Sequence, residues 1–577
     1  MTDLKAWLPI NKKELQIRGW EEVDVIIISG DAYVDHPSFG HALIGRLIES
    51  HGFRVAIIPQ PNWRDDLRDF KKLGKPRLFF GITSGAMDSM VNHYTAFKRL
   101  RSDDAYTAGN VSGFRPDYAT VIYSQIVKQL FPDSLVVLGG IEASLRRFTH
   151  YDYWSNRLNP SILKESKADL LIYGMGEKPM LDILKIFENN VSPKVNDFKD
   201  IPQIAYLSDT TQEGIVLHSH ENCVLSKQKF AENFKIIETE SNKIESTKII
   251  QQIENQYLIV NPPATQMTSC ELDNVYALPF TRLPHPTYSK RGEISAFSMI
   301  NCSVNIHRGC FGGCSFCTIS AHQGKFIINR SENSILKEVE IISKMPYFKG
   351  YITDLGGPSA NMYRMQGIKQ EICKKCSRPS CIFPAVCHNL CFDHHPLISL
   401  YSKVSQIKNI KKITIGSGIR YDMLQCSNRE KINAYGLQVY TSELIRNHVS
   451  GRLKVAPEHT ENSILQLIRK PSFEQFLQFK TDFDAINLKY NLNQQLIPYF
   501  ISSLPGCRLQ DMQLLSRKMK NIHYNPEQVQ DFTPTPMTLA SVIFYTGINP
   551  YTGEKVFCET NVLKKKEQNQ WFFKNKH

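Results

Sequence analysis

Three closely spaced cysteines carry the clearest chemical signal in the chain. Cys310, Cys314 and Cys317 stand at the spacing C-x3-C-x2-C, directly after a predicted strand. A structural zinc ion takes four closed ligands, whereas a 4Fe-4S cluster held by three thiolates keeps one iron open for a ligand from outside the protein. The spacing therefore favours a cluster with an open iron. Buried thiols, or a zinc site completed by a distant residue, are the alternatives.

The residues around these cysteines suit such a loop. Gly309, Gly312 and Gly313 let the backbone curl closely around a bulky group, because glycine accepts positive φ. Arg308 is the residue we expect to offset part of the negative charge of the cluster.

This loop, with Phe316 just before the third cysteine, resembles the signature of radical S-adenosylmethionine (SAM) enzymes. The resemblance implies that Cys310, Cys314 and Cys317 hold the cluster, that SAM chelates the open iron, and that Phe316 lies near the adenine. It also implies that a low-potential electron donor, a flavodoxin- or ferredoxin-like protein, supports cleavage of SAM to a 5'-deoxyadenosyl radical. The protein would contribute positioning and exclusion of water.

Further segments extend the resemblance. Gly356 and Gly357, in TDLGGPSANMY, stand where many radical SAM proteins carry a Gly-Gly-Glu that contacts the SAM amino group, and here Pro358 replaces the acid. Ser417, in IGSGIRYD, ends a predicted strand at a place where the superfamily gathers SAM contacts. The strand ends LKVAPEH and YFISSLPG occupy similar places. For each of these residues, a role in the turn alone is the alternative.

The segments VLGGIEASLRRFTHYDYW, YGMGE, LPHPTYS, HRGCFGGCSFCTISAHQG, DLGGPSANMY and DFTPTPMT together resemble the YgiQ-type radical SAM family over nearly the whole chain. This implies a radical SAM enzyme that acts on an unknown substrate, with no catalytic residue assigned. Radical modification of RNA or of a protein is one alternative, and a noncatalytic iron-sulfur binding or regulatory module is another.

A second group of cysteines lies in an insert at residues 371–395. Five thiols within nineteen residues are compatible with a structural zinc ion or with an auxiliary iron-sulfur cluster. The candidate ligands of this possible second metal site are Cys373, Cys376, Cys381, Cys387 and Cys391.

The elements that must position these residues form two α/β units. Short apolar runs that end in glycine alternate with helical stretches over residues 1–210, which predicts a doubly wound parallel sheet. Residues 211–280, rich in Lys, Glu, Asn and Gln, are expected to be a helical connection. Residues 281–545 predict a full or partial (β/α) barrel, with a first strand at 296–304, and residues 546–577 a frayed tail.

Many radical SAM enzymes with such an N-terminal domain bind cobalamin, and the glycine-rich strand ends resemble that class of domain. The cobalt-ligating pattern Asp-x-His-x-x-Gly is broken around Asp35, His36 and Gly40. We therefore expect the domain to keep the shape without cobalamin.

Length and composition limit the number of domains, the compartment and the kinds of partner. At roughly 150 residues per domain, 577 residues suggest three or four domains. The apolar runs are far too short to span a bilayer and no secretory signal is evident, so we expect a cytoplasmic protein without a membrane partner. The net charge of +13 suits an anionic partner such as nucleic acid, or only solubility. In a reducing compartment, clustered cysteines indicate metal rather than disulfides.

Overall fold

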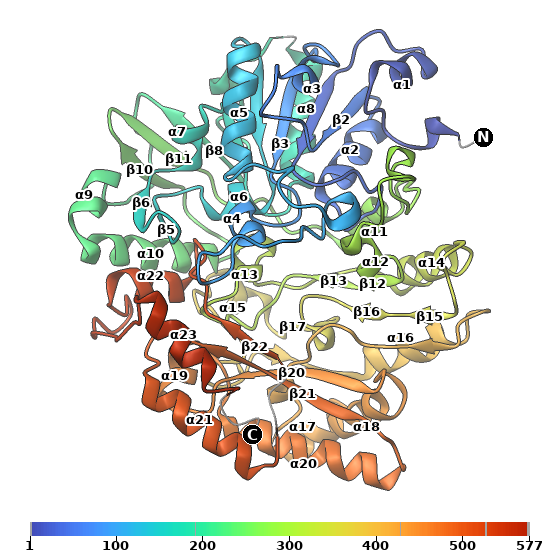
Figure 1. Cartoon of the computed structure of the whole chain (residues 1–577), viewed down its shortest axis with the longest axis vertical. Coiled ribbons are helices and arrows are strands. Elements are labelled where there is room, and N and C mark those ends of the chain that lie inside the picture. Colours follow the sequence, from blue (N-terminus) through green and yellow to red (C-terminus); the bar gives the residue numbers. More distant parts are fainter. Residues whose placement is uncertain (1–2, 191, 427, 525–527, 574–577) are drawn as a thin grey trace.

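A computed structural model of the chain describes residues 3–190, 192–426, 428–524 and 528–573. Within these residues, nine strands form a mixed sheet in the N-terminal half, in the order β2-β1-β3-β4-β7-β8-β11-β10-β9. Figure 1 shows this sheet in the upper half of the molecule. The five parallel strands are β2 (Val55–Pro59), β1 (Val25–Ser29), β3 (Phe79–Thr83), β4 (Leu135–Leu138) and β7 (Leu170–Ile172).

Helices on both faces bury the parallel strands. All five residues of β1 are buried, as expected for a β-branched strand covered on both sides. The main covering helices are α2 (Gly40–Ser50), α5 (Ala119–Leu130) and α8 (Glu177–Asn189). The predicted doubly wound α/β unit is therefore confirmed, with its glycine-rich loops at the carboxyl ends of the strands.

The expected connection over residues 211–280 does more than link two units. It contains the predicted helix, α10 (Lys227–Ser241), but it also adds strands to the sheet. These strands continue the sheet beyond β8 (Ile204–Ser208) and are β11 (Gln256–Val260), β10 (Ile249–Ile253) and β9 (Ile215–Val216). Because β8 runs antiparallel to β7, the sheet turns from parallel to mixed at this point. The boundary expected at residue 210 thus falls inside one sheet.

The second half is the expected partial (β/α) barrel, in the lower half of Figure 1. Its strands pair in parallel as β12 (Ser303–Asn305) with β16 (Asp354–Gly356), β15 (Tyr351–Ile352) with β19 (Lys412–Ile413), and β20 (Arg452–Glu458) with β21 (Gln495–Ser502) and then β22 (Gln528–Asp531). The helices between them are α14 (Glu332–Ser343), α16 (His395–Ser405), α18 (Leu437–Asn447), α20 (Phe473–Lys489) and α21 (Leu509–Asn521).

Two local predictions in this half are wrong. The strand expected at 296–304 begins as a helix, α12 (Ser295–Ile300), because burial follows a helical rather than an alternating pattern there: Ala296 and Phe297 are buried and Met299 is exposed. The tail is not frayed over its described part. It forms α23 (Val562–Gln570), which buries Lys565, whereas residues 574–577 lie outside the described ranges.

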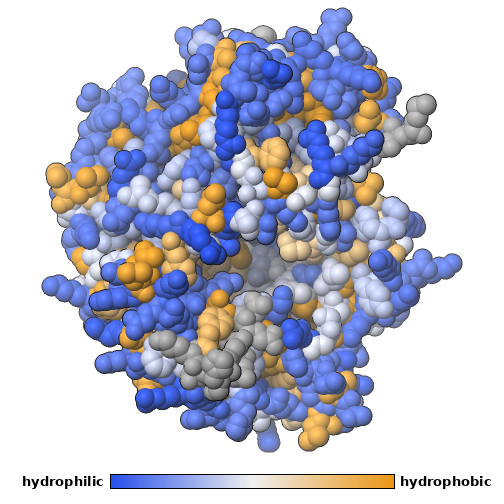
Figure 2. Space-filling model, viewed as in Figure 1, coloured by the Kyte–Doolittle hydropathy of each residue, from blue (hydrophilic) through white to orange (hydrophobic). Residues whose placement is uncertain are grey.

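The molecular surface is largely hydrophilic, and the face in Figure 2 is hollowed near its centre, between the two halves. None of the helices in the described ranges combines the length and apolar character that a bilayer crossing needs. All fourteen cysteines are free thiols.

Candidate active site

A short hairpin presents the loop with the three cysteines. The strands β13 (His307–Arg308) and β14 (Ile328–Asn329) pair antiparallel, and the loop lies between them, followed by α13 (Ile319–Gln323). Gly309 has a φ of 86°, and a Cβ there would lie 2.1 Å from Phe326 O. Only glycine therefore permits the chain to turn into the loop at this point.

The three thiols occupy one buried region. Burial, and after it the neighbouring thiols of the set, raise the pKa of Cys310 and raise that of Cys317 to about 12. Such thiols need an added positive charge to ionise, which a bound metal supplies. In the described part of the chain, no three His, Cys, Asp or Glu side chains converge within reach of a single ion. Three thiols on one loop are the donor set that a cubane cluster with one open iron takes, since each thiolate binds a different iron.

Arg420 brings the positive charge to these sulfurs. Its Nη1 lies 3.5 Å from Cys314 Sγ, and a Cβ at Gly312 would meet the same nitrogen at 2.6 Å. Its Nη2 pairs with the buried carboxylate of Asp422 at 2.6 Å. Asn361 fixes the backbone, because Arg420 N donates to Asn361 Oδ1 at 2.8 Å and Asn361 Nδ2 donates to Arg420 O at 3.1 Å.

Arg308 does not have the role that the sequence suggested. Its guanidinium pairs with the buried Glu177 at 2.5 Å and stands over the ring of Tyr276. Glu177 opens α8 of the N-terminal sheet, in the YGMGE segment. Arg308 therefore joins the cysteine hairpin to the other half of the molecule, and Arg420 takes the position beside the thiols.

The predicted SAM contacts lie near one another at the ends of two strands. A Cβ at Gly356 would lie 2.8 Å from Ser417 Oγ, and one at Gly357 would lie 2.6 Å from His307 Nε2. Asp354 organises the neighbouring turn, since its carboxylate accepts hydrogen bonds from Gly416 N at 2.9 Å, from Ser417 N at 3.1 Å and from the Ser417 hydroxyl. The structure thus brings Gly356 and Ser417 together and leaves no space for larger residues at either glycine.

Phe316 and two buried charges border the loop. The ring of Phe316 is partly buried against the core of the barrel half. Lys470 pairs with Glu458 at 3.5 Å, and its charge also lowers the pKa of Cys317. Burial raises the pKa of Glu458. Sequence analysis placed Glu458 at a strand end but gave no reason to single out Lys470.

A cavity of about 510 Å³ lies between the sheet and the cysteine hairpin. The ends of β1, β3, β4 and β7, the helices α2 and α8, and the residues His307, Arg308, Gly357 and Pro358 of the barrel half line it. It therefore reaches from the apolar inside of the N-terminal unit to the predicted SAM contacts.

Three buried polar atoms that belong to lining residues have no hydrogen-bond partner among the described residues: His41 Nε2, Glu177 Oε2 and His307 Nδ1. His307 Nε2 lies 3.0 Å from the carbonyl of Ser359, which can only accept, so Nε2 carries the proton and Nδ1 is an acceptor. Burial lowers the pKa of His41 to about 3 and that of His307 to about 4, so both rings are neutral at pH 7. Buried polar atoms normally find a partner, which makes these three candidate contacts for a ligand.

His41, rather than His36, lines this cavity. His36 is fully buried, accepts from Ser38 N at 3.1 Å through Nδ1 and lies 3.4 Å from Arg282 Nη1 through Nε2. His41 follows five residues later, at the start of α2. Only the periodicity of α2, which turns this position inward, could have pointed to it.

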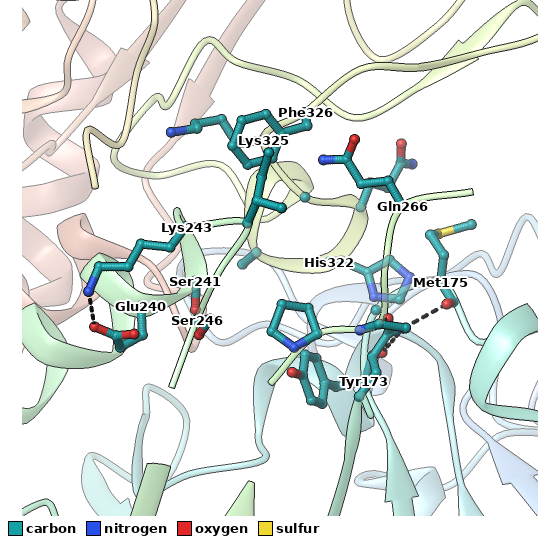
Figure 3. A pocket seen from close by; sticks show the side chains of 18 of the residues that line it. Tyr173, Met175, Glu240, Ser241, Lys243, Ser246, Gln266, His322, Lys325 and Phe326 are labelled. Carbon is teal, nitrogen blue, oxygen red and sulfur yellow. Dashed lines mark hydrogen bonds and ion pairs between the residues drawn. The ribbon is translucent and has the colours of Figure 1, made fainter. Parts of the chain in front are cut away.

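The helix α13 borders the larger cavity, and a second cavity of about 160 Å³ lies beside the same helix (Figure 3). Tyr173 and Met175 line it from the end of β7, and His322, Lys325 and Phe326 line it from α13 and the segment that follows. Burial lowers the pKa of His322 to about 4. His322 borders both cavities, so α13 separates two spaces at the junction of the halves.

The five-cysteine insert packs directly on the three-cysteine loop. Cys381 N donates to Phe311 O at 3.0 Å, and a Cβ at Gly313 would lie 2.2 Å from Pro379 O. The structure therefore places the two cysteine groups of the sequence side by side.

Comparisons with known proteins show the family of this chain. The profile of the family described as "Radical SAM N-terminal" matches residues 7–303. A "UPF0313 protein" of Bacteroides thetaiotaomicron is 57% identical over 99% of this chain and 94% of its own length. Similar proteins of the same description occur in Porphyromonas gingivalis, with 54% identity over 99% of this chain and 90% of the relative, and in Clostridium botulinum, with 44% identity over 97% and 86%.

Among solved structures, the chain resembles the radical SAM methyltransferase TsrM of Kitasatospora setae and the cobalamin-dependent radical SAM enzyme OxsB. For TsrM with tryptophan and a SAM analogue, the TM-score is 0.46 at 11% identity, over 89% of this chain and 75% of that one. For OxsB with aqua-cobalamin, it is 0.48 at 11% identity, over 87% and 53%.

These neighbours correct one expectation from the sequence. We expected a domain without cobalamin, because the Asp-x-His-x-x-Gly pattern is broken at His36. Structures of both neighbours are described with cobalamin bound. The expectation that the domain lacks cobalamin is contradicted by these findings and is not kept.

Proposed function

Because this chain belongs to the UPF0313 family and its residues 7–303 match the family model described as "Radical SAM N-terminal", it is a radical SAM enzyme, and we propose that Cys310, Cys314 and Cys317 bind a 4Fe-4S cluster. When bound, this cluster would supply the electron that cleaves SAM to methionine and a 5'-deoxyadenosyl radical. The observation that carries the proposal is that three thiols share one glycine-rich loop under a single buried guanidinium, that of Arg420.

The surrounding residues have positioning roles in this proposal. Arg420 balances the negative charge of the thiolates, and Asp422 holds its guanidinium in place. Gly356, Gly357 and Ser417 form the floor against which SAM would lie, since a side chain at either glycine would collide with Ser417 or His307. A flavodoxin- or ferredoxin-like protein is the electron donor that we propose.

We assign the substrate to the cavity between the two halves. The cavity borders Gly357 and Pro358 at one end and the apolar face of the sheet at the other. Glu177 Oε2 and His307 Nδ1 are acceptors without a partner among the described residues, so the polar end of the substrate should carry hydroxyl or amine donors. This favours a small amphipathic molecule over RNA or a protein, the alternatives that the sequence left open.

The first experiment is reconstitution without oxygen. We expect the full chain with iron, sulfide and dithionite to convert SAM to methionine and 5'-deoxyadenosine, and the C314A variant to lose this conversion. The control C270A replaces an exposed cysteine outside the loop and should keep this conversion. Turnover by C314A that equals that of the wild type would refute the ligand assignment.

The second experiment tests the cavity without any turnover. We expect n-octylamine to raise the unfolding temperature of the protein, and n-octanoate to do so far less because its carboxylate would face Glu177. The substitution Ile44→Trp should fill the cavity and remove the effect, whereas Leu488→Trp on the exposed face of α20 should not. Equal stabilisation of both variants by octylamine would exclude the cavity as its site.

A further inference from the structure

Two neighbouring arginines of the LRRF segment differ in one respect. Arg146 forms an ion pair with the buried carboxylate of Asp88. Arg147 is 3% exposed, yet no carboxylate among the described residues pairs with it. Its guanidinium makes one hydrogen bond to those residues, from Nη1 to Ser144 O at 2.6 Å, and Nε has no partner there. Because buried charges in proteins are normally paired, Arg147 lacks the anion that its charge needs.

Aromatic rings compensate only part of this burial. The guanidinium carbon of Arg147 lies 4.6 Å from the centre of the Tyr173 ring and 5.5 Å from that of the Phe148 ring. Such contacts attract a cation but accept no hydrogen bond in the plane of the guanidinium. Burial lowers the pKa of Arg147 to about 10, so the side chain is still charged at pH 7. The edge formed by Nε and Nη2 is therefore a charged donor pair without a protein acceptor in the described part of the chain.

Arg147 lines the second cavity, of about 160 Å³, as do Tyr173 and His322 (Figure 3). Six charged residues line this cavity, five of them basic: Arg147, Lys178, Lys243, Arg308, Lys325 and the acidic Glu240. Ion pairs with carboxylates hold Lys178, Lys243 and Arg308. The other two basic residues have no carboxylate partner within the described ranges.

Lys325 is the second of these two. It is 1% exposed, and its ammonium donates to Arg378 O at 2.8 Å and lies 3.9 Å from Cys376 Sγ. Among the lining residues, five basic less one acidic leaves an excess of four positive charges. This excess favours an anion that carries more than one negative charge, as a phosphate group does near neutral pH.

His322 provides an acceptor beside Arg147, since both side chains are hydrogen-bonded to Ser144. His322 Nδ1 lies 3.0 Å from Ser144 Oγ, which donates its own proton to Gly140 O at 2.7 Å. Nδ1 must therefore carry the proton, and Nε2 is an acceptor without a partner among the described residues. A hydroxyl on the anion can donate to Nε2. Inorganic phosphate keeps such a hydroxyl at neutral pH, whereas sulfate and acetate do not.

We propose that this second cavity binds a phosphate group, with the free edge of the Arg147 guanidinium as the main contact and His322 Nε2 as the acceptor for its hydroxyl. A guanidinium edge binds two oxygens of one phosphate through two parallel hydrogen bonds. The cavity has the volume of about five water molecules, so it fits a phosphate ion or the phosphate of a small ester. The helix α13 separates it from the proposed substrate cavity, and the proposal does not depend on SAM cleavage.

The test is calorimetric titration of the full-length protein in buffer free of phosphate and sulfate. We expect inorganic phosphate to bind, and sulfate and acetate to bind at least about tenfold more weakly. R147M should lose phosphate affinity by a similar factor, whereas the control R157M, at an exposed position, should keep it. Equal affinity of R147M and the wild type for phosphate, or equal affinity of the wild type for sulfate and phosphate, would overturn the proposal.

Glycerol 3-phosphate distinguishes the two sources of the phosphate group. If the site takes a phosphorylated small molecule, the ester should bind more tightly than inorganic phosphate, because it fills more of the cavity. If the site takes the free ion, the ester should bind more weakly. In both cases the R147M substitution should weaken binding.

Thermal unfolding separates this binding role from a structural one. Because Arg147 has no carboxylate partner, R147M should unfold at no lower temperature than the wild type without phosphate, and phosphate should raise the unfolding temperature of the wild type alone. R146M leaves the buried Asp88 unpaired and should be clearly less stable. A loss of stability in R147M as large as that in R146M would show that the protein itself satisfies the guanidinium, and would contradict the proposal.

Discussion

Arg420 Nη1 lies 3.5 Å from Cys314 Sγ, although 106 residues separate the two in the chain. The contact crosses from the turn after β19 to the loop after β13, so it forms only when the barrel half is closed. It also lowers the pKa of the Cys310 thiol. The closed barrel therefore favours ionisation of the thiols, the form that binds metal, before any metal is present.

Replacing Arg420 by Gln tests this effect of the guanidinium on the thiols. The buried carboxylate of Asp422 would lose its partner, and we expect the protein without metal to lose about 3–5 kcal/mol of unfolding free energy. The pKa of Cys310 should rise, which the pH dependence of alkylation measures. The control K185Q breaks an exposed ion pair on α8 and should lose no more than about 0.5 kcal/mol. An unchanged alkylation profile for R420Q would contradict the role of Arg420.

Glu177→Gln tests the link between the halves. The substitution keeps the shape but leaves the guanidinium of Arg308 buried without its carboxylate. We expect a loss of roughly 3 kcal/mol in urea unfolding and faster proteolysis between the halves. The matched control E188Q changes an exposed residue of the same helix and should behave as the wild type. If E177Q and E188Q unfold alike, the ion pair does not join the halves.

Gly357→Ala tests the predicted floor of the SAM site. The new methyl group would lie 2.6 Å from His307 Nε2 and would displace the ring from the carbonyl of Ser359. We expect destabilisation of about 1–3 kcal/mol and a raised KM for SAM, with kcat less affected. Gly418→Ala adds the same group to open space and serves as the control. A normal KM in G357A would show that SAM does not lie against this glycine.

Lys565 gives the protein a distinct response to alkaline pH. Burial lowers its pKa from 10.5 to about 8. Between these values the unfolded chain binds more protons than the folded one, so stability should rise with pH across this window, by at most about 3 kcal/mol. Lys565→Met should remove the rise, which denaturant unfolding from pH 7.5 to pH 10.5 measures. Lys564→Met, at the exposed neighbouring position, should keep it.

The sequence predicted the architecture well because local patterns encode it. The predicted apolar strands became β1 to β4 and β7, and the spacing of Cys310, Cys314 and Cys317 placed them on one loop. The family and the partial barrel, which were also predicted from local sequence patterns, were confirmed. Each of these features depends on residues that are neighbours in the sequence.

The predictions that failed concern contacts between distant segments. Arg308 stands beside the cysteines in the sequence, yet it turns to Glu177, and the charge beside the thiols comes from Arg420. The strands β10 and β11 lie within a polar stretch, and only the pairing of β11 with β8 and of β10 with β11 shows that they belong to the sheet. No spacing rule relates such partners, because tertiary packing selects them.

The helix α23 has a consequence for how the chain matures. Lys565 Nζ donates to the hydroxyl of Tyr153 at 3.0 Å, a residue 412 positions earlier. This contact between α23 and the first half can form only after the ribosome has released residue 565. A nascent chain therefore lacks this contact until residue 565 has emerged, and a stop codon at or before that position would prevent the contact from forming.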